Sequence, residues 1–352
     1  MRRRQFVALL SSMAALALAW PVAAHAQQRM KRIGVLMGVA DDVEGKARLR
    51  AFLQGLRELN WTDGQNAQLE VRWAAGDPNA ISAYATEFAA LNLDVILAVT
   101  TAAFVTMQRV TQSTPIVFVQ VVEPLSSGLV TSLAHPAGNS TGFTSYEYAT
   151  AGKWLATLKE VAPKVEHVAV IAHPDDPASA GYLREGASLA RSLGVEFVPT
   201  GARTISEVEG ALGEFARKSN GGMIVLPSAF TAANREQIVA LAASHRLPAV
   251  YPFKYFAAVG GLLTYGFDNI ELYKRAAGYV DRILKGAKPS DLPIQQPTRF
   301  ELVVNLKTAK ALGLTIPEAF LVRADEVIER KSPRANPRRS IVQCEIVDFS
   351  SR

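Results

Sequence analysis

Short apolar runs in the first part of the chain alternate with segments in which apolar residues recur every three or four positions. The runs at 32–39, 95–99 and 115–122 have the length of strands, and a continuous apolar run is typical of a strand buried on both faces. Between the first two, apolar residues follow helical spacing around Leu49–Leu59 and again around Tyr84–Leu91. These patterns predict alternating strands and helices.

The same rhythm restarts after an extended segment at 140–146. Helices are predicted at 147–162, 178–193, 204–218 and 231–245, alternating with strands at 166–172, 195–199 and 222–227. From 269 the order changes to a helix, a proline-rich link, the strand "TRFELVVN" and the helix "LKTAKALG". Strands separated by helices of this length indicate an α/β fold with parallel sheets flanked by helices. Two such series without a long linker predict two similar lobes that share a hinge.

Length and charge agree with this picture and exclude one class of partner. A chain of 352 residues has room for two domains of ~100–200 residues. The net charge of +6 lies at the two ends, because residues 1–26 carry three arginines and residues 330–352 carry six basic residues. The segment 27–329 is left with 29 basic and 30 acidic residues. Such a balance gives no electrostatic case for nucleic acid.

The two ends of the chain have compositions of their own. Residues 1–26 have a basic start, an apolar stretch and Ala24-His25-Ala26, the layout of a cleaved secretory signal, which predicts export to the periplasm. Arg3-Arg4-Gln5-Phe6-Val7 also resembles a twin-arginine signal. Residues 330–352 are predicted to be a disordered basic tail. They hold the only cysteine, Cys344, so no internal disulfide is expected.

The sequence contains no constellation that supports catalysis. Gly138-Asn139-Ser140-Thr141-Gly142 fits G-x-S-x-G, but a loop precedes it and an extended segment follows, whereas a nucleophile elbow needs a strand before the serine and a helix after it. The histidines are scattered, and none pairs with another ligand at metal spacing. We therefore expect a protein that is not an enzyme, with no metal and no cofactor.

Polar and aromatic residues instead collect where the predicted strands end. In open α/β sheets, ligands bind in the crevice beyond the carboxyl ends of the strands. Two such edges facing each other would form a cleft between the lobes. The candidate ligand-binding residues are Thr100, Thr101, Gln120, Glu123, His173, Asp175, Ser228, Phe230, Tyr251, Phe253 and Tyr265.

Thr100-Thr101 marks the sharpest of these junctions, because a buried strand there passes directly into a helix. A helix N-terminus has unpaired N–H groups and a partial positive charge, so this junction could bind a carboxylate, with one threonine as cap. Glu123, at the end of a neighbouring strand, could accept hydrogen bonds from an ammonium group. Together the two would suit an amino-acid zwitterion. The alternative is that both hydroxyls only cap the helix.

Several stretches resemble the bacterial ABC-transporter substrate-binding proteins of the tryptophan/tyrosine-transport type. They include "TPIVF" at 114–118, "HPAGNSTGF", "RADEVIE" and the long block "GGLLTYGFDNIELYKRAAGYVDRILKGAKPSDLPIQQPTRFELVVNLKTAKALGLTIP". The similarity covers about 31–329. Two departures are Glu123, where the family usually has Asp, and the continuation of the chain beyond "ADEVIE".

The resemblance implies the fold of a type I periplasmic binding protein, with two Rossmann-like lobes joined by three crossovers. The crossovers would lie near 144–147, 265–268 and 292–296. The first lobe would contain 31–145 and 266–292, and the second 146–265 and 293–329. Some relatives are thought to bind aromatic amino acids.

The leading hypothesis is therefore a monomeric periplasmic solute-binding protein of an ABC importer. It would capture a small ligand between its lobes, with an amino acid such as an aromatic one as the candidate, and deliver it to an ABC permease in the inner membrane. Two alternatives use the same residues. One is a ligand-sensing periplasmic module of a signalling system, and the other is a protein that binds a sugar-like or other small metabolite.

Overall fold

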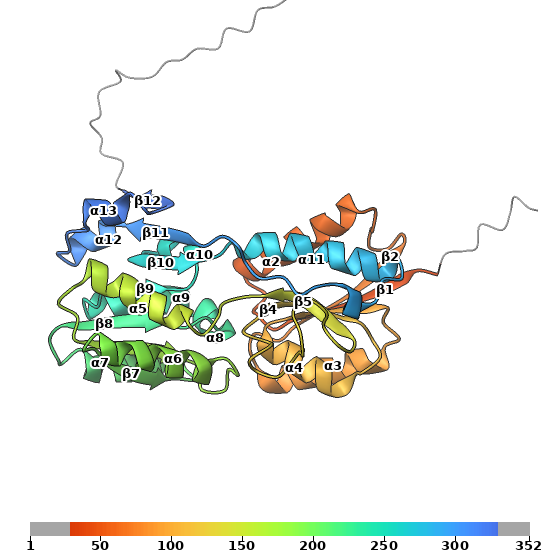
Figure 1. Cartoon of the computed structure of the whole chain (residues 1–352), viewed down its shortest axis with the longest axis horizontal. Helices are drawn as coiled ribbons and strands as arrows, with labels where there is room; N and C mark the ends of the chain where they lie inside the picture. The colour runs from red at the N-terminus through yellow and green to blue at the C-terminus, as the bar shows by residue number, and fades with distance from the viewer. Residues whose placement is uncertain (1–28, 330–352) are drawn as a thin grey trace, which may run out of the picture.

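The computed structural model describes residues 29–329, which form two α/β lobes side by side (Figure 1). The predicted signal segment 1–26 and the predicted tail 330–352, with Cys344, lie outside the described residues. The first lobe contains a five-stranded parallel sheet in the order β2-β1-β3-β4-β5. Its strands are β1 (Lys31–Met37), β2 (Ala67–Trp73), β3 (Val95–Val99), β4 (Ile116–Val121) and β5 (Ser140–Thr144).

Helices cover both faces of this first sheet. On one face α2 (Val43–Glu58) packs against α11 (Asn269–Leu284), and on the other α3 (Pro78–Ala90) packs against α4 (Thr101–Val110) (Figure 1). All five residues of β3 are buried, as expected for a continuous apolar run between two helical layers. A short 3-10 turn, η1 (Pro289–Asp291), follows α11 and contacts β5.

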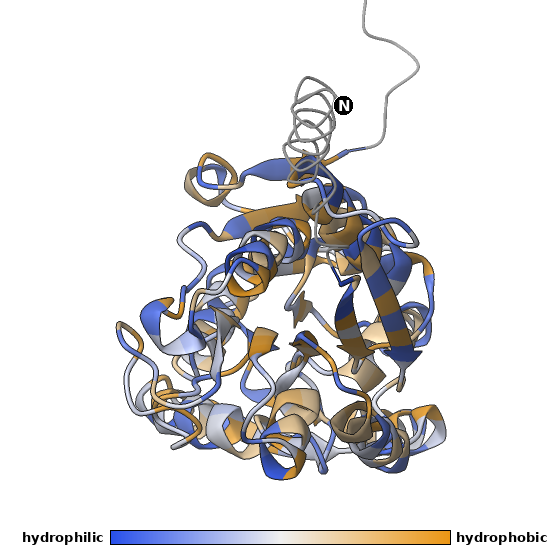
Figure 2. Ribbon diagram, turned by 90° about the vertical axis from the view of Figure 1, so that its right-hand side faces the viewer, coloured by the Kyte–Doolittle hydropathy of each residue, from blue (hydrophilic) through white to orange (hydrophobic). Residues whose placement is uncertain are grey.

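The second lobe contains a seven-stranded sheet in the order β12-β11-β10-β9-β8-β6-β7. Its strands are β6 (His167–Ala172), β7 (Glu196–Gly201), β8 (Gly221–Val225), β9 (Ala249–Tyr251), β10 (Leu263–Gly266), β11 (Glu301–Asn305) and β12 (Glu326–Ile328). Its helices are α5 (Thr150–Val161), α6 (Ser179–Ser192), α7 (Ile205–Phe215), α8 (Ala229–Ala233), α9 (Arg235–Ser244), α10 (Lys254–Ala258), α12 (Leu306–Ala311) and α13 (Glu318–Leu321). Apolar residues form the core of both lobes. Figure 2, in which the first lobe faces the viewer, shows apolar positions along the strands and helices of that lobe.

Two details of this lobe differ from the sequence prediction. The single helix predicted at 231–245 is divided at Asn234, which ends α8 and begins α9 with backbone angles that leave the helical range. The second sheet is also not wholly parallel, because β11 runs antiparallel to β10. The chain reaches β11 from the first lobe, at the edge where β10 ends, and can therefore pair only by running back along it.

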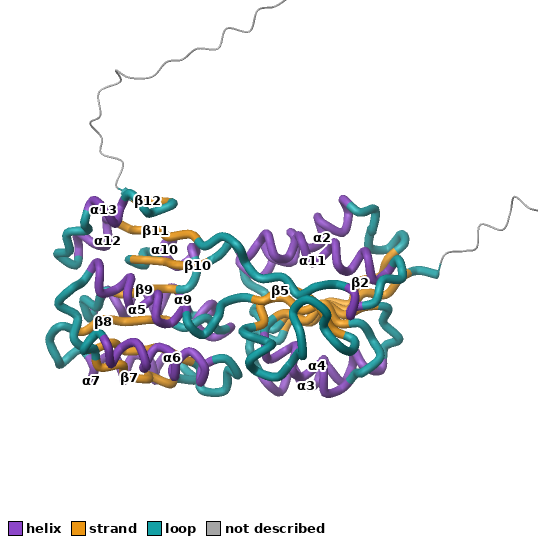
Figure 3. The backbone as a smooth tube through the Cα atoms, viewed as in Figure 1, coloured by secondary structure: helices purple, strands orange, loops and turns teal. Residues whose placement is uncertain are grey.

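Three connections join the lobes, at 145–149, 267–268 and 296–300 (Figure 3). Each contributes an aromatic ring to one cluster, in which Tyr146 lies 4.7 Å from Phe267 and 6.0 Å from Phe300 between ring centroids. One assignment is corrected: residues 293–295, predicted to belong to the second lobe, extend the first. The N–H of Gln295 donates to Gly142 O at 2.9 Å, which closes the free edge of β5. The rest of the predicted division remains a prediction.

Candidate functional site

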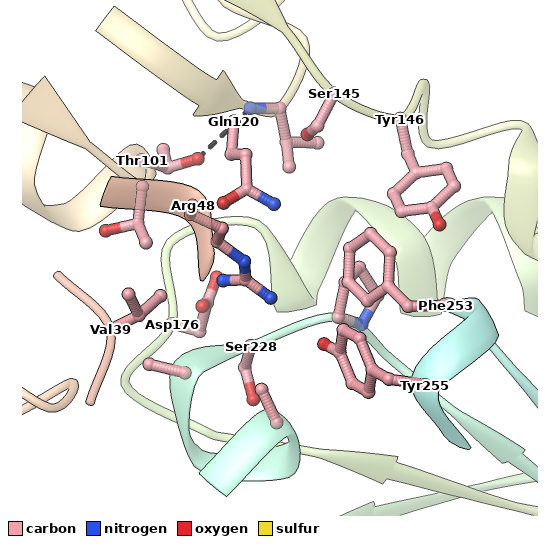
Figure 4. Close-up of a pocket in the computed structure, with 15 residues that line it drawn as sticks. Val39, Arg48, Thr101, Gln120, Ser145, Tyr146, Asp176, Ser228, Phe253 and Tyr255 are labelled. Atoms are coloured by element: carbon pink, nitrogen blue, oxygen red, sulfur yellow. Dashed lines mark hydrogen bonds between the residues drawn. The ribbon is translucent and has the colours of Figure 1, made fainter. Parts of the chain in front are cut away.

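Two connected cavities lie between the lobes, at the edge where the strands of both sheets end. The inner pocket has a volume of about 50 Å³ and the outer cleft about 530 Å³. They share Thr100, Asp176, Ser228 and Ala229. The inner pocket draws its walls from both lobes and from the first connection (Figure 4): Val39, Arg48, Thr100, Thr101, Gln120, Val122, Ser145, Tyr146, Asp176, Pro227, Ser228, Ala229, Ala232, Phe253 and Tyr255.

The Thr100-Thr101 junction lies in the inner pocket, as the sequence predicts, but both hydroxyls also have structural partners. Thr100 is the N-cap of α4, and its Oγ1 accepts from the Ala103 N–H at 3.4 Å. Thr101 Oγ1 accepts from the Val122 N–H at 3.1 Å, which ties the helix to the end of β4 (Figure 4). The junction therefore holds the N-terminus of α4 at the pocket, where its partial positive charge favours an anion.

Gln120 also lies in the inner pocket, and its orientation is fixed. Its amide donates to Asn269 Oδ1 at 2.8 Å and accepts from the Tyr273 hydroxyl at 2.7 Å. Both partners belong to α11, which packs against the first sheet. Gln120 is thus a rigid part of the first lobe's wall.

Arg48 lines the inner pocket but is not among the residues that the sequence predicted for the site. It projects from α2 into the inner pocket, is only 3% exposed, and its Nε has no hydrogen-bond partner (Figure 4). Its guanidinium carbon lies 5.7 Å from the ring centroid of Tyr255 in the opposite lobe. A signal was present, because Arg48 falls on the stripe of α2 formed by Ala51, Phe52, Gly55 and Leu56, which is the buried face of the helix. A charged residue on a buried stripe needs a partner.

In the second lobe, the carboxylate that reaches both cavities belongs to Asp176 and not to the predicted Asp175. Asp175 lines the outer cleft, but Arg203 donates to both of its carboxylate oxygens at 2.8 Å. Asp176 reaches both cavities instead. Burial raises the pKa of Asp176 to about 6, opposed only by a hydrogen bond from the Ala178 N–H. Nothing in the letters "HPDD" distinguishes the two carboxylates, since their difference arises from tertiary packing.

The aromatic candidates separate into those that face the cavities and those that do not. Phe253 lines the inner pocket, where it stacks on Tyr255 at 5.3 Å, and Phe230 and His173 line the outer cleft with ring centroids 5.5 Å apart. Tyr251 is buried against Phe256, and Tyr265 stacks on Phe300 away from both cavities. The structure therefore does not bring these two tyrosines to the site.

Of the two remaining predicted residues, the structure places Ser228 in the cavities and Glu123 outside them. Ser228 lies in both cavities, where it forms a capping box with Thr231 at the start of α8. Glu123 lies outside both, in a separate 290 Å³ pocket beside the connections. Its Oε1 accepts from the Tyr148 N–H at 2.8 Å, and the Ser126 hydroxyl donates to Oε2. The structure therefore does not bring Glu123 to the two cavities, and its role as an ammonium acceptor stays a prediction.

An ion pair joins the lobes beside the inner pocket. Arg235 Nη1 of α9 lies 2.7 Å from Oδ2 of Asp42, the N-cap residue of α2. Hydrogen bonds from Gly45 and Arg235 and the charge of Arg235 hold the pKa of Asp42 below its usual value, although burial acts in the opposite direction. Within residues 29–329, no group of three or more His, Cys, Asp or Glu side chains could hold a metal ion. No helix in the same range is long and apolar enough to cross a bilayer.

Two α/β lobes, three connections and a pocket between facing strand ends define a solute-binding protein of the type I periplasmic class. A family model described as ABC transporter substrate binding protein matches residues 32–328, and the chain belongs to this family. The tyrosine-binding protein of Clostridioides difficile (strain R20291) is 25% identical over 288 residues, which are 82% of each chain. Members of the family are solute-binding proteins and not enzymes, and they are typically extracytoplasmic.

Solved structures show the same fold. A conserved domain protein from Vibrio cholerae is 26% identical with a TM-score of 0.79, covering 85% of this chain and 100% of that one. An ABC domain from Streptococcus pneumoniae in complex with L-Trp is 23% identical with a TM-score of 0.77, covering 85% and 99%. A ligand-free, open substrate-binding protein with adhesive properties from Clostridium difficile is 23% identical with a TM-score of 0.61, covering 85% and 100%.

Proposed function

We propose that this protein is the periplasmic solute-binding subunit of an ABC importer, and that it captures an aromatic amino acid between its lobes for a permease in the inner membrane. The observation that carries the proposal is the inner pocket together with the outer cleft that continues it, because the walls of both come from both lobes. A ligand held there contacts both lobes only when they meet, so binding favours closure. Closure is what distinguishes a loaded binding protein from an empty one.

Two further observations support an aromatic amino acid. Relatives are described as tyrosine-binding and as a complex with L-Trp. Phe253, Tyr255 and Tyr146 form an aromatic wall in the inner pocket (Figure 4), and aromatic rings pack favourably against one another. The layout of residues 1–26 supports export, and cleavage after Ala26 would leave Gln27 at the mature N-terminus.

A thermal-shift screen of the chain from Gln27 onward tests the ligand class. The probes are the twenty L-amino acids and a matched set of monosaccharides and polyols. We expect L-tryptophan or L-tyrosine to raise the melting temperature, with a stabilisation of ~2.7 kcal/mol at a hundredfold excess over the dissociation constant. Small-angle scattering should then show a smaller radius of gyration with that amino acid bound. A shift with a sugar and with no amino acid would overturn the proposed ligand class.

A further inference from the structure

Two opposite charges face one narrow pocket without neutralising each other. Arg48 enters the inner pocket from the first lobe, and Asp176 enters it from the second (Figure 4). Within residues 29–329, neither forms an ion pair with any group closer than 4.0 Å, although fifteen other pairs do. Two buried donors in the same pocket, Arg48 Nε and Tyr255 Oη, also lack a hydrogen-bond partner.

Such an arrangement is costly for a protein on its own. A buried donor without a partner loses its hydration and gains nothing in return, typically at a cost of ~1–3 kcal/mol for each group. Buried charges in proteins are therefore usually paired with each other. Asp176 accepts one hydrogen bond, from the Ala178 N–H, but no cation in the described part of the chain lies close enough to pair with its charge. Here the side chains of α2 and of the loop after β6 leave both charges open to the same small space. A ligand that carries one negative and one positive group would satisfy both.

We propose that Arg48 binds the carboxylate, and Asp176 the ammonium group, of an α-amino acid. This assignment rests on the proposed function and deepens it, because it names the groups that recognise the ligand. The N-terminus of α4 at Thr100-Thr101 adds a second favourable potential for the carboxylate. Tyr255 Oη is a further donor from the second lobe.

The assignment makes the charged head group the link between the lobes. The carboxylate belongs to the first lobe and the ammonium to the second, so a ligand with only one of these groups leaves the other lobe with an unsatisfied charge. Sites built to bind a polar group reject an analogue that lacks it far more strongly than an apolar pocket rejects a missing methylene. The pocket is thus expected to select for amino acids before it selects among side chains.

The experiment combines ligand truncation with side-chain replacement, measured by calorimetry. The probes are L-tryptophan, tryptamine, which lacks the carboxylate, and indole-3-propionate, which lacks the ammonium group. If the screen selects L-tyrosine, tyramine and 3-(4-hydroxyphenyl)propionate replace the analogues. Arg48→Met removes the charge but keeps much of the length of the aliphatic side chain, and Asp176→Asn removes the charge but keeps the shape of the side chain. We expect each variant to bind the amino acid 10- to 100-fold more weakly, as for loss of one charge-assisted hydrogen bond.

The analogues separate recognition from a folding defect. Arg48→Met should not weaken tryptamine binding and should strengthen it if anything, because that ligand has no carboxylate to lose and leaves the arginine unsatisfied. Asp176→Asn should likewise not weaken the binding of indole-3-propionate. The matched controls are Arg50→Gln, on the exposed side of the same helix, and Glu185→Gln in α6, a partly exposed carboxylate that pairs with Arg184 and lines neither cavity. Both controls should bind L-tryptophan like the unmodified chain.

The outcomes distinguish the two proposals. If the unmodified chain binds no amino acid, the proposed function is overturned. If it binds amino acids but Arg48→Met weakens the binding of the amino acid and of tryptamine equally, the head-group assignment is overturned and the proposed function stands. The same holds for Asp176→Asn if it weakens the binding of the amino acid and of indole-3-propionate equally.

Discussion

The two edges that face each other across the cleft are built differently. In the first lobe, three non-glycine residues at or beyond the ends of β3 and β4 have positive φ angles: Thr100 at 86°, Gln120 at 62° and Glu123 at 39°. In the described part of the second lobe, the non-glycine residues with positive φ are Asn220 and Arg246, which precede β8 and β9 at the opposite end of the sheet. Among the described strand ends that border the cleft, non-glycine residues with positive φ are thus found on the first lobe's side and not on the second's.

This difference indicates that the two lobes contribute to the cleft in different ways. A β-branched residue such as Thr100 adopts a positive φ only where its surroundings hold it there, and such positions cluster at functional sites. The first lobe therefore offers a preformed wall in which Thr100, Thr101 and Gln120 are fixed. The second lobe uses unstrained devices, such as the capping box at Ser228, and contributes the aromatic rings and the carboxylate. Four predictions test this contrast.

The largest effect is expected at Gly38, which follows β1. A Cβ added there would overlap Thr100 Oγ1 and lie 2.5 Å from Val99 O, so the strained junction requires glycine as its neighbour. Gly38→Ala should lower the free energy of unfolding by about 2–4 kcal/mol. It should also weaken ligand binding, because Thr100 must move. Urea unfolding and calorimetry measure the two effects.

Gly201, at the end of β7 in the second lobe, is the matched control. The nearest atom to an added Cβ is Pro174 Cβ at 4.0 Å, so Gly201→Ala should change stability by less than about 0.5 kcal/mol. Equal losses at the two glycines would show that the first lobe's edge is no more tightly constrained than the second's.

The second prediction contrasts a permanent charge with a titrating one. Arg48 stays charged at all ordinary pH values, whereas the pKa of Asp176 is raised from 3.8 to about 6 by burial. Folding thus favours the protonated carboxyl. This contribution to stability is complete below the unfolded pKa and is lost as the pH rises through about 6. Asp176→Asn should therefore stabilise the ligand-free protein by up to about 2 kcal/mol at pH 7.5 and by much less at pH 4.

Melting temperatures of both proteins at pH 4 and pH 7.5 check this sign. The charged and titratable neighbours are His173, Asp175 and Arg203, with the Tyr182 hydroxyl behind Asp176. A His173→Gln background controls for the histidine. The same substitution is expected to weaken amino-acid binding, so stability and affinity should change in opposite directions. A loss of stability at pH 7.5 would contradict the burial of an unpaired carboxylate.

The third prediction concerns the contact between the lobes. The Asp42–Arg235 pair is partly buried, with side chains 32% and 14% exposed, and it can form only when the lobes are close. Arg235→Met should weaken ligand binding by about 3- to 10-fold, equivalent to ~1 kcal/mol, mainly through faster release. Arg323→Met removes an exposed pair with Glu160 within the second lobe and should leave release unchanged. Stopped-flow measurement of ligand dissociation compares the two variants. Equal dissociation rates would show that the Asp42–Arg235 pair does not stabilise the closed state.

The sequence predicted the fold well because the strands are nearly continuous apolar runs between amphipathic helices. Five of the residues that it proposed for the candidate site, Thr100, Thr101, Gln120, Ser228 and Phe253, line the inner pocket. These residues lie at strand ends, where a rule about topology applies. Arg48 lies in the middle of a helix, and its place on the buried stripe of α2 indicates only that it needs a partner. That it reaches the pocket depends on the packing of α2 beside the cleft, which no local pattern shows.

The antiparallel β11 and the choice between Asp175 and Asp176 were unpredictable for the same reason. The direction of β11 depends on the chain's return from the first lobe. The carboxylates differ because Arg203, 28 residues away from Asp175 in sequence, reaches only one of them. In each case the deciding contact is between segments that the sequence does not show to be neighbours.

The smallest effect is expected at Glu123, which has a strained backbone like Thr100 but lies outside both cavities. Its Oε1 accepts from the Tyr148 N–H, so it fastens the end of β4 to the start of the second lobe. Glutamine keeps an acceptor oxygen of the same reach, and Glu123→Gln should change ligand affinity less than twofold. Glu123→Ala removes the acceptor and should cost about 1 kcal/mol of stability. Calorimetry and urea unfolding give both values. A tenfold loss of affinity in Glu123→Gln would place its charge within reach of the ligand. The strained backbone beyond the end of β4 would then position a ligand-binding residue, as the strained backbone at the end of β3 is proposed to do.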